Sequence, residues 1–268
     1  MSRHSMGSDL GKEFRVSENE SASSTWTIPP NAPLFPRFPI EYRDVEIVTT
    51  VYRTESGAIA DHLIDPIKST GDTVMIHFYH MPDVAGMGEV QEANIMTGVK
   101  VSTPGGDHFG GFSTNLYISS DVGLSQGREI HGQPKKFGTT RIEIRGDTIV
   151  AEICRNGITI ARSTTPYKYQ KAQIEELSSY FPFQENINHK VVRNIDGSKG
   201  VDQITSRTLS DVVIKDCWKG PATLILEPNI NAPLYKLPVI ETLESFYWKV
   251  DFTLVPGEIL VDLLAKGM

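Results

Sequence analysis

The chain has 268 residues, of which 39% are hydrophobic and 22% are charged, so it can bury a large core. Its formal net charge of -7 argues against a nucleic-acid partner, because no excess of basic residues is available to neutralise phosphates. It has two cysteines, Cys154 and Cys217, and no His-Glu-x-x-His or paired Cys-x-x-Cys motif, which indicates a reducing compartment and no zinc site.

Residues 1–28 are polar and rich in Ser and Glu, without the apolar run that a signal peptide or membrane anchor requires. They predict a flexible N-terminal lead. No later stretch approaches the roughly 18 apolar residues of a membrane span, which predicts a cytoplasmic protein with no membrane partner. The prolines of 29–33 disfavour helix and mark the entry into folded structure. Without internal repeats or a long linker, residues 29–268 are expected to form a single domain.

Short β segments, rich in β-branched and aromatic residues, follow this entry. Gly146-Asp147 and Asn156-Gly157 predict hairpin turns between some of them, because Asn, Asp and Gly tolerate positive φ. The expected strands are 45–53, 73–81, 111–119, 140–145, 148–155, 157–163, 188–193, 207–216, 222–227 and 246–255.

Helical periodicity is confined to 56–63, 168–177 and 256–265. In the last range, Pro256 and Glu258 are residues that favour the first turn of a helix. Four apolar side chains would share one face of that helix: Ile259, Leu260, Leu263 and Leu264. The predicted fold class is therefore α+β, antiparallel and β-rich, and periodicity alone does not choose between a barrel and a sandwich.

Two adjacent lysines, Lys135 and Lys136, lie between Pro134 and Phe137-Gly138. Most Lys-Lys pairs are solvated surface charges, and an ordinary lysine amine, with a pKa of about 10.4, is protonated at pH 7. A lysine becomes a nucleophile when burial and a neighbouring cation disfavour its ammonium form. The pair is thus either a solvated charge or a nucleophile activated by its neighbour.

The longer string 127–138, Gly-Arg-Glu-Ile-His-Gly-Gln-Pro-Lys-Lys-Phe-Gly, resembles the signature of the acetoacetate decarboxylase family. Acetoacetate decarboxylase is itself the standard example of a lysine activated by a neighbouring cation. The resemblance implies that Lys135 forms a Schiff base, that Lys136 is the activating cation, and that the fold is a cone-like β-barrel with flanking helices. It extends over most of the chain, at 35–37, 51–54, 218–221 and 237–239.

The resemblance also singles out the segment 86–92. In the family, a loop with two glycines carries a carboxylate that matches Glu92 and that places the substrate or moves a proton. The alternative is an ordinary solvated loop glutamate. Because a carboxylate next to an amine stabilises ammonium, Glu92 is expected on the substrate side of the site and not against Lys135.

The chain departs from the family at two positions. The family's carboxylate-handling arginine falls on Val45, and its second active-site glutamate falls on His77. Arg43 would share one face with Val45 if the segment is extended, so it could supply the missing cation. An exposed arginine at the start of a strand is the alternative.

Two more residues are candidates for the substrate side. A histidine at position 77 would replace a fixed anion by a titrating acid or base, although a structural hydrogen-bonding role is equally compatible. Tyr247 takes a position that a histidine occupies in the family. It would either pack with a satisfied hydroxyl or protonate an enamine.

The resemblance therefore implies a lysine Schiff-base lyase acting on a small keto acid or related ketone, namely a decarboxylase of a β-keto acid or a vinylogous relative. One alternative is an aldolase-dehydratase that uses His77 and Tyr247 to condense a keto acid such as pyruvate with an aldehyde. The other is a non-catalytic, ligand-binding barrel. No cofactor and no metal are expected, and the family implies a homo-oligomer.

Overall fold

The computed structural model describes residues 25–265, which divide into two units between residues 34 and 35. Residues 25–34 form turns and bends, in which the N–H of Ala32 donates to the carbonyl of Pro29 at 3.1 Å. Most of the expected lead, 1–28, lies outside the described residues, and a domain start at residue 29 stays a prediction. No helix within 25–265 is long and apolar enough to cross a membrane.

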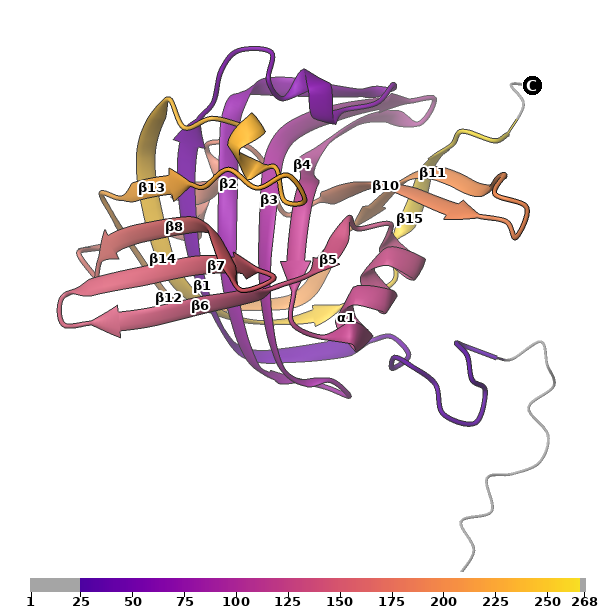
Figure 1. The fold of residues 1–268 in the computed structure, drawn as a ribbon, viewed down its shortest axis with the longest axis horizontal. Coiled ribbons are helices and arrows are strands. Elements are labelled where there is room, and N and C mark those ends of the chain that lie inside the picture. The colour runs from indigo at the N-terminus through magenta and orange to yellow at the C-terminus, as the bar shows by residue number, and fades with distance from the viewer. Residues whose placement is uncertain (1–24, 266–268) are drawn as a thin grey trace, which may run out of the picture. The chain divides into compact units, whose positions relative to one another are not determined.

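Residues 35–265 form two β-sheets (Figure 1). The larger sheet has 11 strands, and the smaller has four. Ten strands of the larger sheet follow one another in the order β15 (Glu258–Asp262), β11 (Lys199–Arg207), β10 (Asn186–Arg193), β4 (Gly106–Ile118), β3 (Gly88–Thr103), β2 (Ile67–Val84), β1 (Ile40–Arg53), β14 (Glu241–Leu254), β12 (Leu209–Gly220) and β9 (Gln170–Lys171). The eleventh, β5 (Lys135–Phe137), pairs with β4. The smaller sheet has the order β13 (Thr223–Leu226), β8 (Ile158–Pro166), β7 (Thr148–Arg155) and β6 (Thr139–Arg145).

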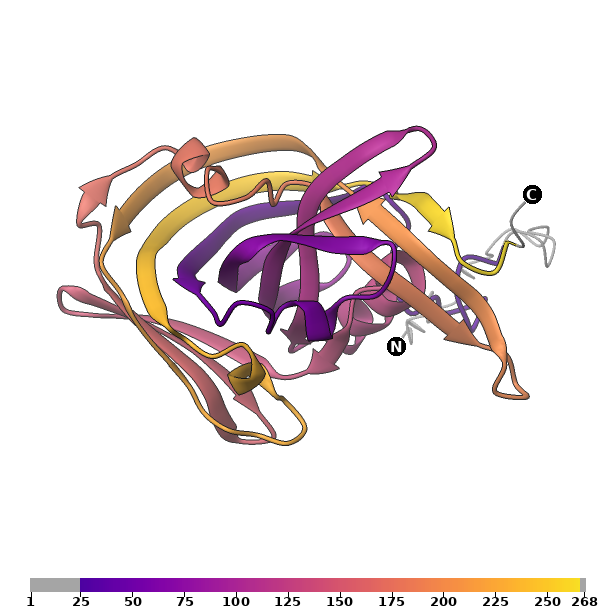
Figure 2. The ribbon, with the colours of Figure 1, turned by 90° about the horizontal axis from the view of Figure 1, so that it is seen from above.

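The strands pair antiparallel with two exceptions, the parallel pairs that β4 forms with β10 and with β5. Strands β1, β14 and β12 curve together in nested arcs (Figure 2). The antiparallel, strand-rich part of the prediction is confirmed. The order of the larger sheet ends at β15 on one side and at β9 on the other, so a closed cone-like barrel stays a prediction.

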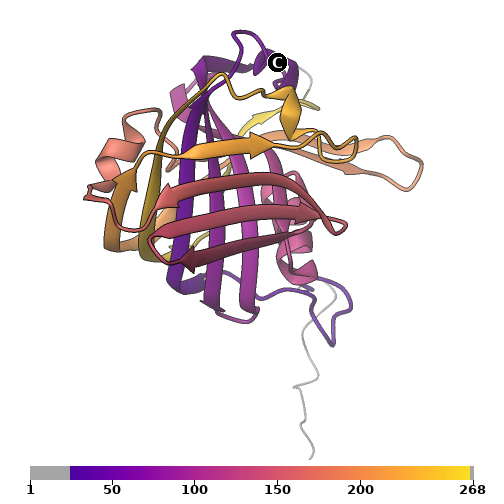
Figure 3. The ribbon, with the colours of Figure 1, turned by 60° about the vertical axis from the view of Figure 1, so that its left-hand side comes forward.

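The smaller sheet packs against one face of the larger one, across strands β1 to β3 (Figure 3). Val74, Ile76 and Phe78 of β2 face it and share a core with Ile149 and Ile153 of β7. The alternate residues of β2 point to the opposite face, where a second core forms. Because both faces are buried there, the central residues of β2 from Val74 to Phe78 are apolar except for His77.

Each of the ten expected strands overlaps an observed strand. The helical expectations were less accurate. Range 56–63 contains only the 3₁₀ turn η2 (Ala60–His62), and range 168–177 contains β9 and the start of the short α2 (Ile174–Ser178). A further 3₁₀ turn is η4 (Leu234–Lys236), and α1 (Asp121–Gln126) continues into the π-helix η3 (Gly127–His131).

The predicted helix 256–265 is wrong. Its central residues form strand β15, which pairs antiparallel with β11 so that Val261 lies opposite Ile204. Pairing with an existing sheet edge outweighs the intrinsic helix preference of so short a segment. Five strands were not predicted as strands: β3, β5, β9, β11 and β15.

A buried hydrogen-bond chain joins three neighbouring strands of the larger sheet. The indole N–H of Trp248 donates to the hydroxyl of Thr49 at 3.0 Å, and this hydroxyl lies 2.8 Å from His77 Nδ1. His77 is fully buried, and burial lowers its pKa to about 3. Its imidazole is therefore neutral in the folded protein at ordinary pH.

We expect His77 to make the fold acid-sensitive. The unfolded chain takes up a proton on this residue below about pH 6.5 but the folded chain does not, so stability falls as the pH drops from 6.5 toward 3. His77→Gln should remove up to about 1.4 kcal/mol of this loss per pH unit, measured by urea unfolding at pH 7, 6 and 5. His80→Gln is the control, because the His80 side chain is 39% exposed. An unchanged pH slope in His77→Gln would contradict the assignment.

Candidate active site

A cavity of about 290 Å³ lies on the face of the larger sheet opposite the smaller sheet. Strands β1, β2, β3, β12 and β14 supply most of its wall. Six polar residues of its lining are buried or half-buried: Glu92, Asn94, Gln126, Gln133, Lys135 and Asn186. The cavity thus joins the motif lysine to a set of amides and one carboxylate.

The motif string 127–138 forms the support of Lys135. After α1 and the π-helix, Gly132 adopts φ 76° and ends the helical segment, and the chain enters β5. Leu116 of β4 pairs with Lys135, and the guanidinium of Arg128 donates to the Lys135 carbonyl at 3.1 Å. The helical turn before Pro134 therefore fixes the backbone from which the lysine side chain projects.

Gly127 makes room for the lysine stem. A Cβ built at this position would lie 2.5 Å from Lys135 Cε and 2.8 Å from Gln133 Oε1. Gly127 has ordinary helical φ of -64°, so its backbone does not require glycine. The requirement at Gly127 is space for Lys135.

Glu92 lies directly against the amine, contrary to expectation. Its Oε2 is 2.8 Å from Lys135 Nζ, and the two side chains are 12% and 7% exposed. Glu92 is also not in a loop, because it belongs to β3. The two side chains thus form a largely buried ion pair on the cavity wall.

Lys136 points away from this pair. Its side chain is exposed, and its Nζ donates to the carbonyl of Asn231 at 3.0 Å. Successive residues of a strand project to opposite faces, which separates Lys136 from Lys135. The structure therefore does not place Lys136 beside the amine as an activating cation.

Arg43, His77 and Tyr247 do not line the cavity. Arg43 is exposed and forms ion pairs with Glu41 and Asp83. His77 is next to Tyr79, which does line the cavity, with ring centroids 5.8 Å apart.

Tyr247 lies in the core between the two sheets, and its hydroxyl donates to Glu46. Burial, followed by the hydrogen bond to Glu46, raises the pKa of this phenol. Val45, where the family has its arginine, is a fully buried core residue.

Arg207 is a cavity cation that the sequence did not reveal. It lies at the end of β11, and no carboxylate among residues 25–265 pairs with it. Burial, and next the charges of Arg207 and Lys135, lower the pKa of His131 to about 2. The positive charges of Arg207 and Lys135 thus both disfavour protonation of the His131 imidazole. No motif signalled Arg207, because its place at the cavity depends on the pairing of β11 with β10.

Two phenols on the cavity wall remain protonated. Burial, and next the charge of Glu92, raise the pKa of Tyr42 and of Tyr79 well above the ordinary value, while Arg207 opposes this shift. Both hydroxyls can therefore donate hydrogen bonds to a ligand near Glu92.

Two amides of the cavity wall have unused hydrogen-bonding atoms. Gln126 Nε2 and Asn94 Oδ1 are buried without a partner among the described residues. In contrast, Asn186 Oδ1 accepts from Gln133 Nε2 at 3.1 Å, which holds the Gln133 amide in place. Buried polar atoms normally have partners, so Gln126 and Asn94 are less well satisfied than the Gln133–Asn186 pair.

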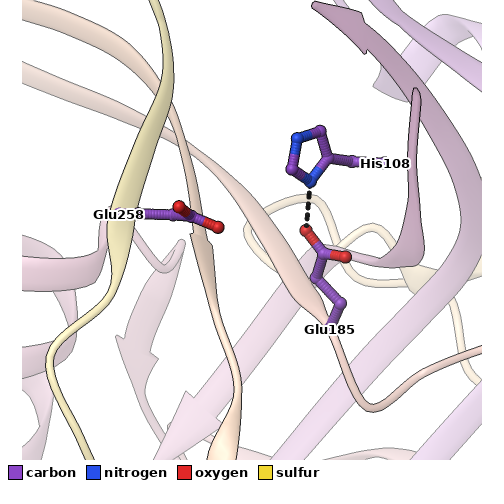
Figure 4. Close-up of side chains that lie close together, drawn as sticks. All are labelled: His108, Glu185 and Glu258. Atoms are coloured by element: carbon purple, nitrogen blue, oxygen red, sulfur yellow. Dashed lines mark hydrogen bonds and ion pairs between the residues drawn. The ribbon is translucent and has the colours of Figure 1, made fainter. Parts of the chain in front are cut away.

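A group outside the cavity could hold a divalent cation: His108, Glu185 and Glu258 (Figure 4). Their ligand atoms lie within 4.8 Å of one another. Glu185 Oε1 lies 3.0 Å from His108 Nδ1 and accepts from the Ser206 hydroxyl at 2.7 Å. These contacts tie β4 and β11 to the segment before β10, and none of the three lines the cavity.

Comparisons with known proteins agree in one family. A family model described as acetoacetate decarboxylase (ADC) matches residues 21–264. Acetoacetate decarboxylase 1 of Bradyrhizobium diazoefficiens is 29% identical over 243 residues, 91% of this chain and 95% of that protein. The acetoacetate decarboxylase of Burkholderia multivorans is 29% identical over 244 residues, 91% of this chain and 97% of that protein. The crystal structure of acetoacetate decarboxylase from Legionella pneumophila has a TM-score of 0.82 at 26% identity, covering 93% of this chain and 100% of that chain.

We expect Gly127→Ala to lower the free energy of unfolding by about 1–3 kcal/mol, because the added methyl group overpacks the lysine stem. In the Lys135→Ala background the same change should cost less than half as much, since Cδ and Cε are gone. The two backgrounds form a double-mutant cycle measured by urea unfolding. Gly71→Ala is the control, with nothing within 4 Å of its added Cβ. Equal costs in both backgrounds would show that Gly127 does not make room for Lys135.

Proposed function

Because the chain belongs to the acetoacetate decarboxylase family, and is therefore a lyase, we propose that it decarboxylates a β-keto acid through a Schiff base on Lys135. The observation that carries the proposal is the buried contact of 2.8 Å between Lys135 Nζ and Glu92 Oε2 in the cavity. An amine and a proton acceptor are the two groups that imine formation requires.

The proposed reaction begins with a proton transfer. Glu92 takes a proton from the Lys135 ammonium, and the free amine attacks the ketone carbon of the substrate. Glu92 gives this proton to the hydroxyl of the addition product, so that loss of water yields a protonated imine and Glu92 is again a carboxylate. The bond to the carboxylate carbon then breaks, its electron pair moves into the imine as carbon dioxide leaves, and an enamine remains. A proton taken up from solvent and delivered by Glu92 to the enamine carbon, followed by hydrolysis, releases the ketone and restores Lys135.

Arg207 is proposed to hold the substrate carboxylate. It is a cavity cation with no carboxylate partner among the described residues, whereas the charge of Lys135 is matched by Glu92. Guanidinium groups bind carboxylates by charge-assisted hydrogen bonds. In this proposal Arg207 takes the role for which the sequence suggested Arg43.

The cation at Arg207 favours decarboxylation over the alternatives. The aldolase-dehydratase interpretation relied on His77 and Tyr247, neither of which lines the cavity. A non-catalytic barrel would gain little from a buried Lys135–Glu92 pair, because desolvation of two charges offsets much of their attraction. The homo-oligomer and the cytoplasmic location stay predictions.

We expect borohydride reduction in the presence of acetoacetate to trap one covalent adduct per chain. Its mass, measured on the intact protein, should be that of the substrate after loss of carbon dioxide. Lys135→Ala should give no adduct, because the imine nitrogen is absent. Lys136→Met should retain the adduct, since its amine bonds to Asn231 at the surface. Glu92→Gln should slow formation of the adduct by about 10²–10⁴-fold.

The outcomes of trapping separate the candidate functions. An adduct with pyruvate but not with acetoacetate would favour the aldolase-dehydratase. An adduct that persists in Lys135→Ala, or no adduct with either keto acid, would overturn the proposal.

We expect Arg207→Met to raise KM for acetoacetate by about 10–100-fold, the loss typical of a hydrogen bond to a charged group. Borohydride trapping with acetone should be unchanged in this variant, because acetone has no carboxylate. Arg193→Met is the matched control, since Arg193 is exposed and bonds to the carbonyl of Gly197. Equal losses with acetone and acetoacetate would mean that Arg207 does not act on the carboxylate.

A further inference from the structure

One long side of the cavity is apolar. Alternation along β14 places Trp248, Val250, Phe252 and Leu254 on the same face, and all four line the cavity. At about 3.3 Å per residue, this row runs for about 20 Å.

Strand β12 widens this wall. Leu209 and Ile214 pair with residues of the β14 row and also line the cavity. The register shifts between Ser210 and Val213, and Val212 reaches the cavity too. Val212 is 50% exposed, which places it at the cavity mouth.

Acetoacetate would leave most of this wall uncovered, because it carries only a methyl group beyond its ketone. The cavity volume of about 290 Å³ is close to the range of about 300–1,000 Å³ that is typical of pockets for much larger ligands. Its charged lining residues among those described are Glu92, Lys135 and Arg207, and the proposed reaction uses all three. A group that covers the remaining wall is therefore uncharged.

We infer that the substrate is a β-keto acid with an aliphatic chain of several carbons, which lies along the wall formed by β12 and β14. This inference rests on the proposed function, with the imine at Lys135 and the carboxylate at Arg207. Each methylene that moves from water onto the wall adds binding free energy, which acetoacetate cannot gain. The products are carbon dioxide and a long methyl ketone.

The test is a series of β-keto acids with methyl, propyl, pentyl and heptyl chains beyond the ketone. Release of carbon dioxide is measured for the wild-type protein, and the rate with Lys135→Ala is subtracted as the uncatalysed background. We expect kcat/KM to rise by about fourfold per added methylene until the wall is covered.

A pair of neighbouring substitutions tests the location of the chain. Val212→Trp narrows the mouth and should lower the ratio of heptyl to methyl kcat/KM by at least about tenfold. Val213→Trp is the matched control, because Val213 is 56% exposed and does not line the cavity. Its ratio should equal that of the wild type.

The results distinguish this inference from the proposed function. Turnover of the methyl substrate with a kcat/KM that is flat or falls along the series would overturn the inference and leave the proposed function standing. No Lys135-dependent release from any member of the series would overturn both. Equal effects of Val212→Trp and Val213→Trp would contradict the location of the chain.

Discussion

The buried contact between Lys135 and Glu92 is the constraint on which the site depends. Strand β4 lies between their two strands: Glu92 of β3 pairs with Ile118, and Lys135 of β5 pairs with Leu116. With about 4.8 Å between neighbouring strands, the two backbones are about 10 Å apart, a gap that the long lysine side chain spans. The parallel pairing of β5 with β4, and the glycine at position 127, are what allow the amine to meet the carboxylate.

The electrostatic surroundings of the amine differ from those that the motif suggested. An anion touches Lys135, and the adjacent lysine in the sequence points to the surface. Arg207 is the cation inside the cavity, and it acts on the same neutral imidazole of His131 as Lys135 does. The structure therefore places a carboxylate and an arginine in the cavity with Lys135, and not the second lysine of the motif.

The sequence predicted the features that local chemistry determines. Apolar alternation located ten strands, and the motif located the lysine. The C-terminal segment was misjudged because its apolar residues fit a helical period, while pairing of Glu258 with Ser206 decides its structure. Arg207, Gln126 and Asn94 could not be assigned to the site from sequence, since their meeting depends on strand register and on the curvature of the larger sheet. Arg43 and Tyr247 were assigned to the site from the sequence but do not line the cavity. Matching a family position in sequence does not determine toward which face of the sheet a side chain points.

The surroundings of Lys135 and the apolar wall of the cavity come from different parts of the chain, and this separation has a chemical consequence. Strands β3 and β5 and the helical turn before β5 surround Lys135, whereas the apolar wall comes from β12 and β14 near the C-terminus. Under the proposed function, substitutions in the wall would change which chain fits without moving the amine, because the proposed imine chemistry is the same whatever group lies beyond the ketone. Under the proposed function, Lys135, Glu92 and Arg207 carry the reaction, and the wall formed by β12 and β14 selects the substrate.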